Sequence, residues 1–94
     1  MPREKIAAFC HRWQITEFAI FGSALRNDFN ALSDIDILVS FNDAAEITLL
    51  DLAQMQIELE RLFNRPVDLI EKAALRNPYR REEILETAQV IYAN

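Results

Sequence analysis

Residues 21–36 read FGSALRNDFNALSDID, and this stretch decides how the rest of the chain is interpreted. Gly22 is the single glycine of the chain and stands directly before Ser23. Glycine reaches backbone conformations that other residues avoid and leaves room for close approach of another group, so its position here indicates a turn. After ten intervening residues, Asp34 and Asp36 flank one isoleucine. The stretch therefore predicts a tight turn that leads, after a connection, into an acidic strand.

The segments on either side of this stretch have the composition of β-strands. Residues 15–21, ITEFAIF, are short, aromatic and β-branched, and they end at the glycine. Residues 34–41, DIDILVSF, alternate in polarity, which places successive side chains on opposite faces of a strand. One face is expected to be core and the other to begin acidic. The core face holds Ile35, Ile37, Val39 and Phe41, and the other holds Asp34, Asp36, Leu38 and Ser40.

Helical spacing of apolar residues marks two long segments. Residues 3–13 place Ile6, Phe9, Cys10 and Trp13 on one helical face. Residues 44–63 do the same with Leu49, Leu52, Met55, Leu59, Leu62 and Phe63. Three further apolar residues of this second segment lie off its stripe, and we interpret them as either ordinary surface or an interface: Ile47, Leu50 and Ile57. Ser23 is also expected to cap a short helix that runs to about Asn27.

The C-terminal third adds one strand and one helix. Pro66 ends the preceding helix, and residues 67–70, VDLI, form a short strand with Asp68 on the face opposite its apolar neighbours. Asn77 and Pro78 are typical of the start of a last helix, which is expected to run to about Ala88. The following VIY either extends that helix or forms an edge strand. The fold class is α/β (α+β), a small mixed β-sheet flanked by helices.

Composition narrows the function classes. Ninety-four residues form one domain, and a core of this size is often completed by a partner, so a homo-oligomer or hetero-oligomer is possible. The net charge of -5 disfavours direct nucleic-acid binding. Cys10, the single cysteine, excludes an internal disulfide and suits a reducing compartment. No apolar run approaches the ~18 residues of a membrane span, and nothing resembles a signal peptide, so we expect a cytoplasmic protein without membrane contact.

The acidic residues have the pattern of a metal site. Asp34 and Asp36 are two residues apart on one strand face, about 6.5–7 Å between Cα atoms, and a divalent cation between them would relieve their repulsion. Hard oxygen ligands suit Mg²⁺, which completes its shell with water and substrate phosphate. If Asp68 lies on the adjacent strand, it adds a third carboxylate or a base for an incoming hydroxyl. Gly22 and Ser23 at a helix start could hold the phosphate oxygens.

Gly22-Ser23, ten residues, then Asp34-Ile35-Asp36 resembles the GSX10DXD signature of the DNA polymerase β-like nucleotidyltransferase superfamily. The chain is similar to the minimal nucleotidyltransferase (MNT) family over nearly its whole length. The resemblance implies the nucleotidyltransferase fold, with a nucleoside triphosphate held by Gly22 and Ser23 and Mg²⁺ bound by three aspartates, Asp34, Asp36 and Asp68. Arg26 is retained and could neutralise phosphate charge, whereas Asn27 replaces the family's usual glycine; Asn tolerates a left-handed backbone.

The resemblance also implies a partner. Related proteins are encoded beside a HEPN-domain toxin and act as the antitoxin of a toxin-antitoxin pair, transferring AMP from ATP to a tyrosine of the toxin. Two alternatives stay open: a catalytically silent antitoxin that neutralises the toxin by binding only, and nucleotidyl transfer to a small molecule. Intact Asp34, Asp36 and Asp68 favour the enzyme over the silent form.

Other residues are interpreted as structural. His11 is expected on the surface of the first helix rather than at a metal, because no His or Cys partner stands at ligand spacing. Cys10 and Trp13 are expected in the core. Tyr79, Arg80 and Arg81 are interpreted first as a solvated helix start, with contact to nucleotide or partner as the alternative.

Overall fold

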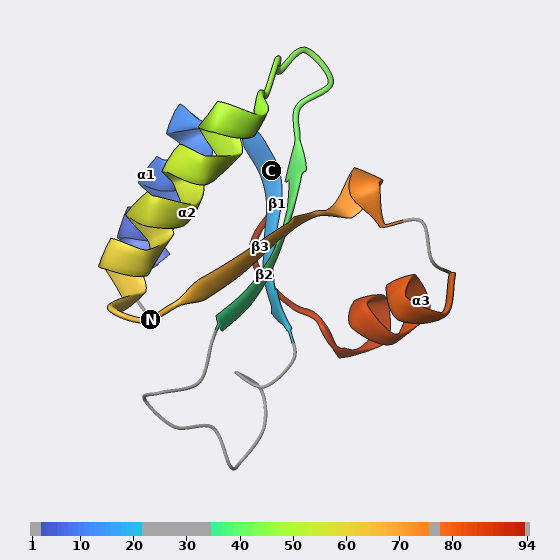
Figure 1. Ribbon diagram of the computed structural model, residues 1–94. Helices are drawn as coiled ribbons and strands as arrows, with labels where there is room; N and C mark the ends of the chain where they lie inside the picture. Colours follow the sequence, from blue (N-terminus) through green and yellow to red (C-terminus); the bar gives the residue numbers. More distant parts are fainter. Residues whose placement is uncertain (1–2, 22–34, 76–77, 94) are drawn as a thin grey trace.

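The structure, a computed structural model, describes residues 3–21, 35–75 and 78–93 (Figure 1). The predicted short helix from Ser23 and the predicted cap at Asn77 lie outside these residues. In chain order the elements are α1 (Arg3–Arg12), β1 (Ile15–Phe21), β2 (Ile35–Phe41), α2 (Leu49–Phe63), β3 (Val67–Glu71), the 3-10 turn η2 (Lys72–Ala74), α3 (Pro78–Thr87) and β4 (Gln89–Ala93).

The four strands form one mixed sheet in the order β3-β2-β1-β4. β1 pairs antiparallel with both β2 and β4, whereas β2 and β3 run parallel. Helices α1 and α2 lie side by side on one face of the sheet, and α3 lies on the other (Figure 1). This arrangement confirms the predicted fold class. It also decides the open question at the C-terminus, because the VIY segment belongs to the edge strand β4 and does not extend α3.

The sheet has an apolar core on each face. The larger cluster lies under α1 and α2 and includes Ile37 and Val39 of β2. The smaller cluster lies under α3, where Leu38 of β2 packs with Phe21 and Ile84. The alternation predicted for β2 is therefore confirmed, but the face that begins acidic is also a core face: Leu38 is buried as fully as its neighbours. α3 is the element that covers it.

Helix α2 begins at Leu49, five residues later than the sequence predicts. Thr48 caps it with a capping box: its hydroxyl accepts from the Asp51 backbone N–H at 3.1 Å, and the Asp51 carboxylate accepts from the Thr48 N–H at 3.0 Å. Residues 44–48 have no regular structure. Leu49 was predicted on the core stripe, but in the first turn it is 85% exposed. Met55 and Leu59 form the fully buried part of this helix.

The connection from α2 to β3 turns on a left-handed residue. Asn64 has φ 56° and ψ 43°, and its backbone N–H donates to the carbonyl of Glu60. Among residues other than glycine, Asn tolerates this left-handed conformation well, because its short polar side chain can hydrogen-bond locally. The turn lets the chain reverse from the helix into a strand within three residues. Asn64 therefore sets where β3 begins.

No helix among the described residues is long and apolar enough to cross a membrane. His11 is exposed on α1, as the sequence predicts. Cys10 is fully buried and Trp13 is partly buried against the larger cluster, so both belong to the core as expected.

The left-handed turn at Asn64 predicts unequal effects of two small substitutions. Asn64→Ala is expected to lower the free energy of unfolding by about 1 kcal/mol, because alanine is strained at positive φ. Asn64→Gly is expected to stay within about 0.5 kcal/mol of the wild type. Urea unfolding followed by circular dichroism measures both. Equal losses in the two variants would mean that the side chain, not the backbone, matters at this position.

Burial of Cys10 predicts a protected thiol. Burial raises the pKa of this thiol from 9.0 to about 12, because the thiolate loses its hydration. Reaction with a disulfide reagent at pH 8 should be slow in the folded protein and fast in denaturant. Because the folded-state pKa is raised, the contribution to stability is complete below pH 9 and is lost as the pH rises toward 12. Rapid reaction of the native protein would contradict this burial.

Candidate active site

Three neighbouring strands each contribute one residue to a row across the sheet, which we call the carboxylate row: Phe21 of β1, Asp36 of β2 and Asp68 of β3. Phe21, the last residue of β1, is the register partner of Asp36 in the antiparallel pair of β1 and β2. Asp36 is in turn the register partner of Asp68 in the parallel pair of β2 and β3. Adjacent strands lie about 4.8 Å apart, so the two aspartates leave the backbone as direct neighbours. The structure thus brings together two carboxylates that stand far apart in the sequence.

Both carboxylates project from the face of the sheet that carries α3. Leu38 follows Asp36 by two residues and lies in the cluster under α3, and Ile70 follows Asp68 by two residues and packs on the same cluster. Residues two apart on a strand share a face. Asp36 is half-buried and Asp68 is exposed. The pair therefore stands at the rim of an apolar cluster, with one aspartate half-buried and the other accessible to solvent.

The turn between α2 and β3 fixes the position of Asp68 along its strand relative to β2. The backbone N–H of Val67 donates to the carboxylate of Glu60 at 3.1 Å. The backbone N–H of Ile35 donates to the carbonyl of Pro66 at 2.9 Å. These bonds tie the first residue of β3 to the helix before it, and the first residue of β2 to the residue before β3. The register that pairs Asp36 with Asp68 is thereby held at the start of both strands.

The donor set fits a hard divalent cation. Two carboxylates on neighbouring strands repel each other when both are ionised, and a cation between them removes that repulsion. Mg²⁺ is usually held by one or two protein carboxylates and takes its other ligands from water and phosphate. Within the described residues no group of three or more His, Cys, Asp or Glu side chains is placed to hold a metal. Asp36 and Asp68 are the two predicted ligands that fall in this part of the chain.

The other predicted site residues lie outside the described residues: Gly22, Ser23, Arg26 and Asp34. Gly22 and Asp34 adjoin described residues, one in the carboxylate row and the other one step before it. Phe21 precedes Gly22 in the sequence and is the register partner of Asp36, and Ile35, which follows Asp34, is the register partner of Val67. Tyr79, Arg80 and Arg81 stand in the first turns of α3, but their side chains also lie outside the described part of the molecule.

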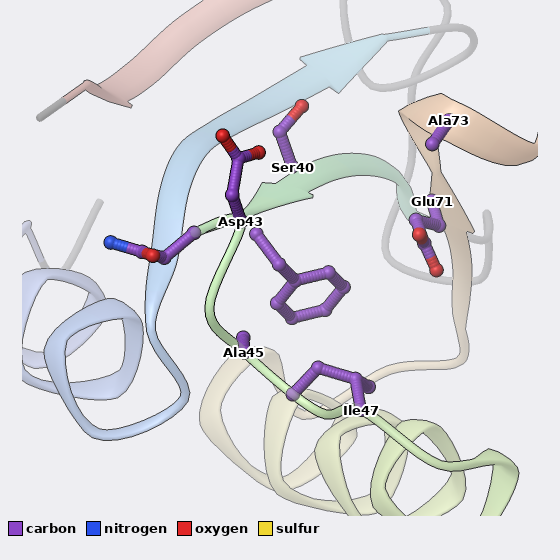
Figure 2. A pocket seen from close by; sticks show the side chains of 8 residues that line it. Ser40, Asp43, Ala45, Ile47, Glu71 and Ala73 are labelled. Carbon is purple, nitrogen blue, oxygen red and sulfur yellow. The ribbon is translucent and has the colours of Figure 1, made fainter.

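A hollow of about 290 Å³ lies at the opposite end of β2 and β3 (Figure 2). None of the predicted site residues that the structure describes lines it. Its lining combines Ser40, Phe41, Asn42, Asp43, Ala45, Ile47, Glu71 and Ala73. Glu71 is the register partner of Val39, three residues along each strand from the Asp36–Asp68 pair. The hollow is therefore separate from the carboxylate row, and the row remains the candidate active site because it joins Asp36 of the sequence signature to Asp68.

A family model described as nucleotidyltransferase domain matches residues 3–91. The chain belongs to this family. A relative from Methanocaldococcus jannaschii, provisionally named protein adenylyltransferase MJ0126, is 39% identical over 75 residues, which cover 80% of this chain and 74% of that protein. Protein adenylyltransferase MntA from Thermococcus cleftensis is 32% identical over 79 residues, covering 84% of this chain and 78% of that one. The chain is thus a nucleotidyltransferase similar to protein adenylyltransferases.

Solved structures agree with this assignment. A chain described as a provisionally assigned minimal nucleotidyltransferase superposes with a TM-score of 0.75 and 34% identity, covering 93% of this chain and 86% of that one. A chain of a toxin-antitoxin complex with AMP-PNP superposes with a TM-score of 0.80 at 17% identity, covering 100% and 75%. The second likeness establishes the shared nucleotidyltransferase fold. Together they confirm the family suggested by the GSX10DXD signature.

The paired carboxylates predict a gain in stability when one is neutralised. In EDTA at low ionic strength and pH 7, Asp68→Asn should raise the free energy of unfolding by a few tenths of a kcal/mol, because like charges directly opposite on neighbouring strands are destabilising by roughly 0.2–1 kcal/mol. Glu71→Gln is the matched control: it removes the same charge from the same strand opposite an apolar residue. Thermal unfolding compares the two. An equal shift in both variants would show that net charge, not the pair, is responsible.

Proposed function

We propose that this protein transfers AMP from ATP to a tyrosine side chain of a HEPN-domain partner, as the antitoxin of a toxin-antitoxin pair. The observation that carries the proposal is the in-register pairing of Asp36 with Asp68 in a chain of the nucleotidyltransferase family. The three aspartates Asp34, Asp36 and Asp68 are proposed as the Mg²⁺ ligands. Gly22, Ser23 and Arg26 are proposed to hold the triphosphate.

The chemistry divides between the bound cation and the protein. When bound, Mg²⁺ would supply positive charge to the phosphate oxygens and help to align the α-phosphate with its attacker. Asp36, half-buried at the rim of an apolar cluster, suits a ligand whose position is fixed by packing. The amides at Gly22 and Ser23 and the guanidinium of Arg26 suit the β- and γ-phosphates.

Asp68 suits contact with the acceptor because it is exposed. In the proposed reaction the tyrosine oxygen forms a bond to the α-phosphorus, the bond to the bridging oxygen of the β-phosphate breaks, and pyrophosphate leaves. The tyrosine proton passes to a base, and Asp68 is proposed for this role as the alternative to binding the cation. A carboxylate reachable from solvent can meet a side chain presented by another protein.

Named relatives and neighbours support the choice of acceptor. Relatives 39% and 32% identical carry the name protein adenylyltransferase. One structural neighbour is described as an MNT antitoxin in complex with a tri-AMPylated HEPN toxin of Shewanella oneidensis, with a TM-score of 0.69 and 16% identity. The acidic net charge of -5 suits a basic partner such as a ribonuclease. These points favour a protein acceptor over a small molecule.

The test is AMP transfer by Asp36→Asn. Purified protein, ATP, Mg²⁺ and the HEPN protein are incubated, and the partner is weighed by intact-protein mass spectrometry. The wild type should add the mass of AMP, and Asp36→Asn should lower the rate by ~100-fold or more, because it removes a metal ligand with little change in volume. Glu71→Gln, which removes a carboxylate from the neighbouring strand β3 outside the row, should keep the wild-type rate.

Three outcomes would contradict parts of the proposal. A wild-type rate in Asp36→Asn removes the metal assignment. Silencing of the toxin by the wild type with no gain of AMP mass favours an antitoxin that acts by binding only. Transfer to a small-molecule hydroxyl, with none to the partner, would favour the small-molecule alternative.

A further inference from the structure

Helix α2 exposes apolar side chains on the side turned away from the sheet. Leu49 and Leu50 are 85% and 83% exposed, and Ile57 is 45% exposed. Ala53, also exposed, lies between them. We call Leu49, Leu50, Ala53 and Ile57 the α2 ridge. Three of the five large apolar side chains that are exposed in the described residues belong to this one ridge.

The ridge is a continuous line on the helix surface. Leu50, Ala53 and Ile57 follow one another at spacings of three and four residues, which places them on one helical face. At 3.6 residues per turn, this face lies opposite Met55 and Leu59, the fully buried residues of the helix. A scattered exposed leucine needs no explanation, but a contiguous apolar line marks a contact surface.

Polar groups that already have partners border the ridge on the side of α1. The Glu58 carboxylate accepts from Gln54 Nε2 at 3.0 Å and from Trp13 Nε1 at 3.4 Å, and it pairs with Arg12. Arg12 also lies over the Trp13 ring, 5.6 Å from its centroid. These interactions fasten α1 to α2, which lie side by side in Figure 1. They leave the ridge itself uncovered.

The exposed face of α2 changes sign along its length. At its N-terminal end Glu46 is exposed two residues before the cap, and Asp51 lies in the first turn. At its C-terminal end Arg61 is exposed, while the Glu60 carboxylate is turned toward the Val67 backbone. A face that is acidic at one end and basic at the other complements a copy of itself in the opposite direction. A uniformly basic partner would meet Arg61 with a like charge.

We propose that the α2 ridge pairs with the α2 ridge of a second copy of this chain, in antiparallel orientation about a two-fold axis. In the matching register Leu50 of one copy lies against Ile57 of the other. The same register brings Arg61 of one copy to the acidic end of the other, where Glu46 precedes the helix. Both contacts occur twice, as isologous pairing requires.

The size of the ridge sets the strength of this pairing. Residues 49–61 span about 18 Å at ~1.5 Å per residue, and four apolar side chains cover less than the ~800 Å² per partner of a stable interface. The net charge of -5 on each copy opposes approach, although ~0.15 M salt screens charges beyond about 8 Å. The dimer is therefore weak and its population depends on concentration.

The pairing is independent of the proposed function. α2 covers the face of the sheet opposite to the one from which Asp36 and Asp68 project. Two copies joined through α2 keep both carboxylate rows open on their outer sides. Failure of either idea leaves the other intact.

Sedimentation velocity of the full chain over a wide concentration range tests whether the α2 ridge forms the dimer. The wild type should shift from monomer toward dimer as concentration rises, and Leu50→Gln should weaken the association by about tenfold or more, since burial of a leucine contributes roughly 1.5–3 kcal/mol. Leu85→Gln is the matched control: Leu85 is 38% exposed on α3, on the other face of the sheet. It should leave the association unchanged.

Charge reversal tests the antiparallel register. Glu46→Arg and Arg61→Glu should each weaken self-association, because each places like charges at both ends of the symmetric pair. An equimolar mixture of the two variants should restore it, since every reversed charge then meets its opposite. A wild type that stays monomeric at the highest concentration, a mixture that does not recover, or equal loss in Leu85→Gln overturns the proposal. If the protein is monomeric and Leu50→Gln weakens its binding to the HEPN partner, the ridge is the binding surface for that partner instead.

Discussion

The parallel, in-register pairing of β2 with β3 is the constraint on which the candidate site depends. Successive residues of a strand point to opposite faces, so a slip of one residue in β3 would move Asp68 to the face under α1 and α2. The slip is opposed by bonds at the start of each strand, from Ile35 to Pro66 and from Val67 to Glu60. It is opposed as well by the left-handed turn at Asn64, which fixes the length of the corner.

The second core explains why these carboxylates are placed where they can act. β2 is buried on both faces, so the residues beside Asp36 on its own face are apolar and α3 excludes water from them. At a given separation, charge interactions are stronger beside such a low-dielectric surface than in bulk water. Asp36 stands at the boundary of this surface and Asp68 just beyond it. A cation held there would sit between a fixed ligand and one that an incoming molecule can reach.

Much of this architecture was accessible from the sequence because it depends on local patterns. The bounds of β1 follow from its aromatic and β-branched composition and the glycine after it, and the alternation of β2 follows from period-two polarity. GSX10DXD predicted the family. An apolar stripe indicates a helix but not its first residue, so the start of α2 was predicted five residues too early, although Thr48 and Asp51 carry the cap signal. The secondary structure of VIY (residues 90–92) could not be decided from the sequence, since three apolar residues suit a helix or a strand. The adjacency of Asp36 and Asp68 required the strand order, which no local pattern contains.

Ile57 and Leu50 show how a structure can resolve an ambiguity that composition leaves open. Their off-stripe positions were compatible with plain surface or with an interface, and burial alone does not choose between them. The choice comes from the surroundings: Glu58 and its partners close one border of the ridge, and charge runs from acidic to basic along its axis. A surface for a foreign basic protein has no need of Arg61 at its far end, whereas a self-complementary surface does. The sign change along α2, more than its exposed area, is what points to a second copy of the chain.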